Sequence, residues 1–104
     1  TTGAIADLTK AIELNGELWQ YHDDRGMIYY HTRNHKEALK AFNSAVKYAA
    51  DSGLQLFHRA NLKIETGKPK PACKDLEESI ALGYKEATEV FNLHCVVSEE
   101  APKE

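Results

Sequence analysis

The stretch HKEALKAFNSAVKYA, residues 35–49, decides the fold because its spacing occurs twice more in the chain. Its small and large apolar residues share one helical face and are Ala38, Leu39, Phe42, Ala45 and Val46. The residues 34 positions earlier are Ala4, Ile5, Leu8, Ala11 and Ile12, and those 34 positions later are Ala72, Cys73, Leu76, Ser79 and Ile80. An equal period of this length, with small residues matching small and large matching large, indicates an array of structural repeats.

Apolar residues at helical spacing predict six helices and no strand. Turn residues separate the segments, such as Asn15-Gly16, Gly67 and Gly83. The helices we expect are residues 4–14, 17–33, 35–49, 54–66, a fifth from near Pro71 to about Leu82, and 85–97. Because the connections are short, each helix should pack antiparallel to its neighbour. The predicted fold class is all-α, an α-solenoid of antiparallel helix pairs.

The bulk composition narrows the possible partners. The 104 residues suffice for one domain, and 42% hydrophobic with 28% charged residues is typical of a folded soluble chain. The formal charge is −3 and no basic cluster follows one predicted face, so we expect no nucleic-acid partner. The apolar runs are far shorter than the roughly 20 residues of a membrane-spanning helix, so we expect no membrane span.

The ends of the chain and its two cysteines support further expectations. There is no initiating Met and no leader pattern, so we expect the chain to be a piece of a longer protein. Cys73 and Cys95 could meet if the last helix folded back on the fifth, but both also suit small buried apolar sites. Two cysteines in helical context do not indicate a disulfide framework. We therefore expect free thiols and a reducing, cytoplasmic compartment.

Two segments resemble the tetratricopeptide repeat, whose pattern is W-x2-L-G-x2-Y, then A-x3-F, then P. The first reads H-x2-R-G-x2-Y from His22 to Tyr29, followed by Ala38-x3-Phe42 and Ala45. The second reads L-x2-R-A-x2-K from Leu56, followed by Ala72-x3-Leu76 and Ser79. The departures from the pattern are His22 for Trp, Arg25 and Arg59 for Leu, and Ala50 and Tyr84 for the closing Pro.

The resemblance implies where the repeats begin and end. Residues 1–16 would be the second helix of a preceding repeat, and residues 19–52 and 53–86 would be two whole repeats. Residues 87–98 would be a capping helix, with its apolar face at Val90, Phe91, Leu93, His94 and Val97, and residues 99–104 a frayed tail.

Two unusual positions in the first helix of each repeat call for a structural explanation. Gly26 costs a helix about 1 kcal/mol relative to Ala, and we expect a neighbouring helix to approach it closely. Arg25 and Arg59 recur one residue before the small position, and we expect them to reach carboxylates such as Asp7 and Asp75. Alternatively, both arginines lay their stems on the core and keep their charged groups in water.

The resemblance also implies a concave groove, lined by the first helix of each repeat, that binds a partner peptide. The positions that correspond to the groove are Gln20, Asp23, Met27, Tyr30 and His31 in the first repeat, Leu54, Phe57, Asn61, Ile64 and Glu65 in the second, and Phe91 and Cys95 in the last helix. Tyr30, Phe57, Ile64 and Phe91 are large apolar anchors if they remain exposed. Alternatively, the helices bury them as ordinary core.

Other kinds of site receive little support. Some family members clamp a C-terminal carboxylate with Lys and Asn, but Asp23 and Met27 stand at those positions here. His31 and His35 have the i, i+4 spacing of metal ligands, yet the predicted turn at Asn34 separates their faces, so we expect no metal and no cofactor. No nucleophile motif, phosphate-binding loop or paired carboxylates appear, and we expect no enzyme activity.

The sequence therefore predicts a noncatalytic module that binds a protein or peptide on its groove. Asn61 would help to orient the bound backbone. The alternative is a structural spacer or a self-associating segment, a homo-oligomer joined through the terminal helices, with no peptide ligand of its own.

Overall fold

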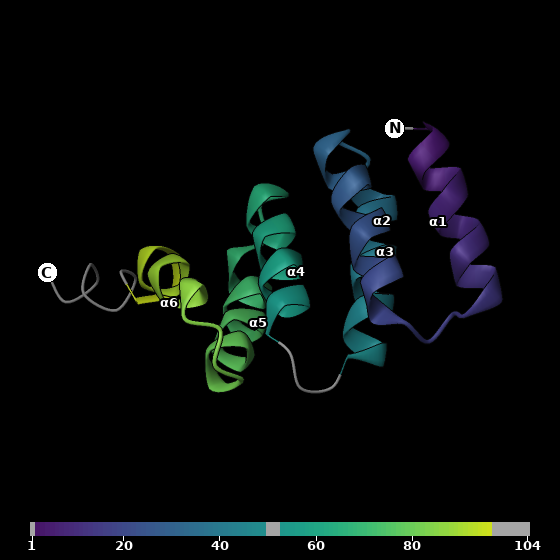
Figure 1. Ribbon diagram of the computed structural model, residues 1–104. Helices are drawn as coiled ribbons and strands as arrows, with labels where there is room; N and C mark the ends of the chain where they lie inside the picture. Colours follow the sequence, from purple (N-terminus) through teal and green to yellow (C-terminus); the bar gives the residue numbers. More distant parts are fainter. Residues whose placement is uncertain (1, 50–52, 97–104) are drawn as a thin grey trace, which may run out of the picture. The chain divides into compact units, whose positions relative to one another are not determined.

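The computed structural model describes residues 2–49 and 53–96, and the regular structure of these ranges is entirely helical (Figure 1). The elements in chain order are α1 (Thr2–Leu14), α2 (Trp19–His31), α3 (His35–Tyr48), α4 (Leu54–Glu65), α5 (Pro69–Ala81), α6 (Glu86–Phe91) and the π-helix η1 (Asn92–Val96). The prediction of an all-helical repeat fold is confirmed. Within the described ranges, no helix combines the length and the hydropathy of a membrane span.

The chain divides into two compact units, residues 1–50 and 51–104. In the first unit α2 packs against both α1 and α3. In the second unit α5 packs against α4, α6 and η1. Each unit thus contains one of the two predicted whole repeats, together with a neighbouring helix.

The last predicted helix is not continuous. Residues 85–97 were expected to form one helix, but α6 ends at Phe91 and a π-helix follows. His94 stands 34 positions after Ala60, where the two repeats have a small residue. Leu93 is 66% exposed and His94 is also exposed, so their expected place on the buried face is wrong. Val97 and the predicted frayed tail at 99–104 lie outside the described residues.

The helix ends repeat one hydrogen-bond pattern. The amide of Asn34 donates to the carbonyl of Tyr29 at 2.8 Å, and the amide of Lys68 donates to that of Lys63 at 2.7 Å. This is the Schellman ending, which places the residue before the donor in the left-handed region. Gly67 has φ 82°, whereas Arg33 has φ 65° at the equivalent place and adopts it without the freedom of glycine.

In the first unit, the expected close approach to Gly26 is confirmed, and the approaching group is the ring of Phe42 on α3. A Cβ atom at Gly26 would lie 2.5 Å from Cε1 of Phe42, a distance that no side chain tolerates. Phe42 is fully buried and cannot move aside without disturbing the core. Because Gly26 has no side chain, it leaves the space that the Phe42 ring fills.

In the second unit, the same two positions hold Ala60 and Leu76. Both are fully buried and belong to one core cluster with Ala72 and Ala87. A smaller side chain on α5 leaves room for the methyl group on α4. The two repeats thus fill a similar space with different pairs of residues.

The prediction for the two arginines is half right. Arg59 donates two hydrogen bonds to Asp75, each of 2.8 Å, and Lys63 lies 2.9 Å from the same carboxylate. Arg25 instead donates to the hydroxyl of Thr9 at 3.2 Å. The carboxylate of Asp75 is almost fully buried, so the two cations compensate its lost hydration.

The expected ion pair between Arg25 and Asp7 is wrong. Asp7 is exposed, and Thr9 on α1 takes the bond from Arg25. Arg59 reaches a residue 16 positions later, and 16 positions after Arg25 stands Ala41, which offers no acceptor. The Nε atom of Arg25 is buried without a hydrogen-bond partner. The first repeat therefore keeps the arginine but lacks the carboxylate.

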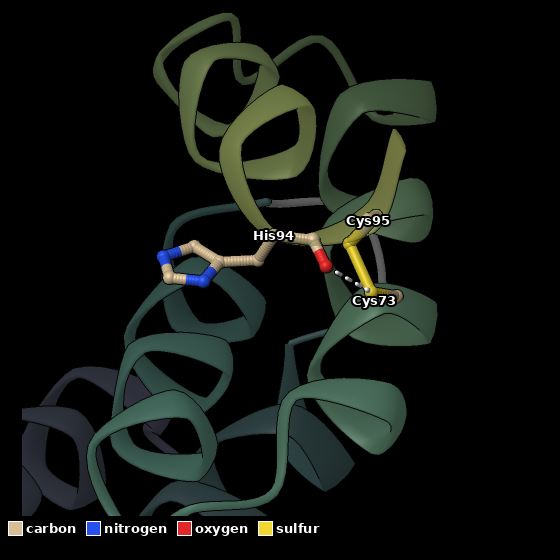
Figure 2. The surroundings of a disulfide bond; sticks show 3 residues. All are labelled: Cys73, His94 and Cys95. Carbon is tan, nitrogen blue, oxygen red and sulfur yellow. Dashed lines mark hydrogen bonds between the residues drawn. A yellow bond between two sulfur atoms is a disulfide. The ribbon is translucent and has the colours of Figure 1, made fainter. Parts of the chain in front are cut away.

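The expectation of free thiols is also wrong. Cys73 on α5 and Cys95 on η1 form a disulfide with a Cα–Cα distance of 5.8 Å, within the usual range of roughly 4.4–6.8 Å (Figure 2). Spacing along the sequence could not show this, because the pairing depends on how the end of the chain packs against α5. The expectation of a reducing, cytoplasmic compartment loses the support that free thiols would have given it.

Candidate functional site

The α2 wall is the predicted set of side chains on α2 in the first unit, and its members differ in exposure. Gln20 and His31 are exposed, and Met27 and Tyr30 are half-buried. The Tyr30 and His31 rings meet edge to face with their centroids 5.5 Å apart. Asp23 is only 4% exposed, so its carboxylate is enclosed rather than presented to a partner.

The α4 wall is the predicted set on α4 and α6 in the second unit. Leu54, Phe57, Asn61 and Ile64 are half-buried and Glu65 is exposed, while Phe91 on α6 is also half-buried. Three of these side chains, Phe57, Ile64 and Phe91, pack against the core cluster of the unit, and so does Cys95. Part of each aromatic or aliphatic side chain therefore belongs to the core, and part reaches the surface.

Tyr84 supports the α4 wall, although the sequence did not predict it to lie there. Its ring lies 5.1 Å from the ring of Phe57, with the planes tilted by 46°. Burial raises the pKa of the Tyr84 hydroxyl, and the negative charge of Glu86 raises it further. The sequence feature that could have indicated this contact is an aromatic residue at the position where the repeat pattern has its closing proline. At that position Tyr84 packs its ring against Phe57.

A separate depression of about 480 Å³ lies between α4 and α5. Its lining mixes both charge signs and consists of Arg59, Lys63, Pro71, Lys74, Asp75, Glu77, Glu78 and Ala81. No residue of the predicted α4 wall is among them. Because Asp75 already binds Arg59 and Lys63, the depression surrounds a satisfied ion cluster rather than an unpaired charge.

The histidine pair considered as a metal site is split between two helices. His31 is the last residue of α2 and His35 the first residue of α3. Within residues 2–49 and 53–96, no group of three His, Cys, Asp or Glu side chains is arranged to hold a metal ion.

These features define a class of protein, the helical-repeat proteins, in which paired helices of equal length recur along the chain. Residues 20–52 match the family model of the tetratricopeptide repeat, so this segment is similar to one such repeat. The matched segment runs from α2 through α3, the repeat that contains Gly26 and Phe42. A search of curated proteins found no match to the chain.

The matched family has a general function. Tetratricopeptide repeats mediate protein–protein interaction, and the family is a non-enzymatic interaction module that binds proteins or peptides. The chain carries such a repeat, and the physical question becomes which of its surfaces a partner would contact.

Proposed function

We propose that the chain binds an extended peptide with apolar side chains on its α4 wall. The observation that carries the proposal is the half-buried state of Phe57, Ile64 and Phe91 on one core cluster. Anchoring in the core restrains these side chains, so a partner that covers their outer parts loses little conformational entropy on binding. Restrained aromatic and aliphatic side chains are typical of the residues that dominate binding energy.

Asn61 gives the α4 wall a polar group between its apolar members. It follows Phe57 by four residues and precedes Ile64 by three, so all three side chains share one helical face. Its amide can donate to a carbonyl and accept from an N–H of an extended backbone. The apolar anchors then supply affinity, and Asn61 supplies orientation.

The α2 wall would make a second, weaker contact of the same kind. Met27 is a flexible thioether that adapts to different partners, and Tyr30 offers an aromatic ring with a polar end. Gln20 and His31 are the exposed polar members. Asp23 is 4% exposed and would not touch the partner.

Selection from a phage-displayed library of random peptides tests the proposal, followed by calorimetric titration of the most enriched peptide. We expect Asn61→Ala to weaken binding by roughly five- to thirtyfold, since a lost hydrogen bond costs about 1–2 kcal/mol. Glu77→Ala, an exposed position on α5, is the matched control and should bind as the unaltered chain does. Equal binding by both variants, or no enrichment against the folded chain, would contradict the proposal.

One observation favours the alternative of self-association. The described side chains of α1 include none that is buried, and Leu14 at its end is 85% exposed. Leu18, just before α2, is 38% exposed. Light scattering over a range of concentrations tests this alternative. A dimer that Leu14→Glu dissociates would support it, and a monomer at all concentrations would exclude it.

A further inference from the structure

The disulfide joins two elements that are separated in sequence by 22 positions, with α6 between them. Cys73 lies in α5, one of the two helices of the second repeat, and Cys95 lies in η1, which follows α6 (Figure 2). The bond therefore fastens the last described element of the second unit to the repeat itself.

The described side chains of η1 bury little surface apart from Cys95. Asn92, Leu93 and His94 are exposed, and only the side chain of Cys95 is described as half-buried. The preceding helix α6 is different, because Ala87 is fully buried and Phe91 packs on the core cluster. Burial of apolar surface thus stabilises α6, whereas among the described side chains of η1 only Cys95, one half of the covalent bond, packs on the core cluster.

The surroundings of the bond offer only a weak substitute for it. Figure 2 shows the His94 imidazole directed away from the two sulfur atoms, while the His94 carbonyl oxygen lies 4.0 Å from the Cys73 sulfur. The sulfur of a disulfide has no proton to donate, so this is a contact and not a hydrogen bond. After reduction the Cys73 thiol could donate to that carbonyl, and a thiol is a weak donor.

We propose that the Cys73–Cys95 disulfide is a redox-operated clasp: a dithiol reductant opens it and releases η1 from α5, while α4, α5 and α6 stay folded. Both cysteines are half-buried, at the edge of the core rather than inside it. They are the two cysteines of the chain, so neither has another internal thiol with which to exchange. The attachment of η1 then depends on the redox state.

The reaction is ordinary thiol–disulfide exchange. A thiolate of the dithiol bonds to one sulfur of the pair, and the S–S bond breaks, so the other cysteine leaves as a thiolate and takes up a proton. The second thiolate of the dithiol then attacks the mixed disulfide and releases the remaining cysteine, which is also protonated. Two electrons pass to the cysteine pair, and the dithiol becomes a disulfide.

Hydrogen exchange of the full chain, read by mass spectrometry with and without dithiothreitol, tests the clasp. We expect reduction to speed exchange of the amides at 92–96 on the order of tenfold or more, with the protection of α4 and α5 unchanged. The matched control is the double variant Cys73→Ser, Cys95→Ser. It should show fast exchange at 92–96 from the start and no response to dithiothreitol.

Three outcomes would overturn the clasp. Unchanged exchange at 92–96 after reduction would show that noncovalent contacts suffice to hold η1. Loss of protection throughout α4 and α5 on reduction would show that the bond holds the whole unit together. This outcome is measured on the unaltered chain, so it can be observed even if the double variant fails to fold. Alkylation of both cysteines after equilibration with oxidised glutathione would show that the bond does not form.

Discussion

The repeat at 19–52 places Gly26 beside Phe42, whereas the repeat at 53–86 places Ala60 and Leu76 at the same two positions. The first helix has a larger residue in the second repeat, Ala60 in place of Gly26. The second helix has a smaller one, Leu76 in place of Phe42. The comparison teaches that the two repeats share the filled volume between their helices rather than the identity of the residues, as close packing requires.

The charged position of the two repeats teaches the opposite lesson. Arg59 finds a buried carboxylate at the position 16 residues later, and Lys63 joins it. Arg25 finds Ala41 at that position and turns to the hydroxyl of Thr9 on α1. Here the second helix has Ala41 where the other repeat has Asp75, so Arg25 makes one hydrogen bond to a neutral acceptor instead of a bidentate ion pair. A buried charge has no equivalent of volume compensation, because its partner must be a specific atom.

The largest effect that separates the repeats should come from Asp75→Ala. The change leaves Arg59 and Lys63 without their shared carboxylate, and their side chains are only about a fifth exposed. We expect the free energy of unfolding to fall by about 2–4 kcal/mol, measured by urea denaturation. The first repeat has no carboxylate to remove, so its comparison is Arg25→Met, which should cost less than about 1 kcal/mol because it removes one longer hydrogen bond to a neutral acceptor. Equal losses would erase the contrast between the two arginines.

The volume argument predicts that Gly26→Ala destabilises the chain although alanine is the better helix former. The added methyl group would overlap the Phe42 ring, and we expect a loss of about 1–3 kcal/mol. Adding Phe42→Leu recreates the pair found in the second repeat and should restore most of the loss. Denaturation of both single variants and the double variant forms a double-mutant cycle. Simple additivity of the two losses would show that the positions do not share space.

The missing carboxylate of the first repeat can be supplied by Ala41→Asp. If Arg25 can adopt the geometry of Arg59, the new carboxylate should couple to it favourably by about 1 kcal/mol or more. The coupling is obtained by comparing the cost of Ala41→Asp in the unaltered chain with its cost in the Arg25→Met variant. Ala41 is 2% exposed, so the single variant is itself expected to lose stability. A coupling near zero would show that Arg25 does not reach the new carboxylate.

The smallest expected change in stability comes from replacing Gly67, which follows α4, and the control is the same replacement of Gly3 within α1. Gly67 has φ 82°, and a Cβ added there would meet no atom within 4 Å, so Gly67→Ala should cost about 1 kcal/mol through backbone conformation alone. Gly3 has equally open surroundings but lies in α1, and Gly3→Ala should be neutral or stabilising by up to about 1 kcal/mol. Thermal unfolding of both variants makes the comparison. A loss at Gly3 as large as that at Gly67 would show that backbone conformation does not explain the ending.

Most helix bounds followed from the sequence because they depend on residues close to one another along the chain. The Asn15-Gly16 stop and the end at Gly67 lie within a residue or two of where the helices end. The α2 and α4 walls were proposed by position alone. The structure shows that one member, Asp23, is enclosed and that Tyr84, which was not predicted, supports Phe57.

The sequence by itself determined that this chain is built of equal helical hairpins, because the spacing of apolar residues encodes both helix period and repeat period. Only the tertiary structure decided that Arg25 bonds to Thr9, that Cys73 and Cys95 form a disulfide, and that the last helix ends in a π-helix. Each of these outcomes depends on distances of a few ångströms between atoms on different helices. Such distances follow from how side chains pack, and no periodic pattern records them.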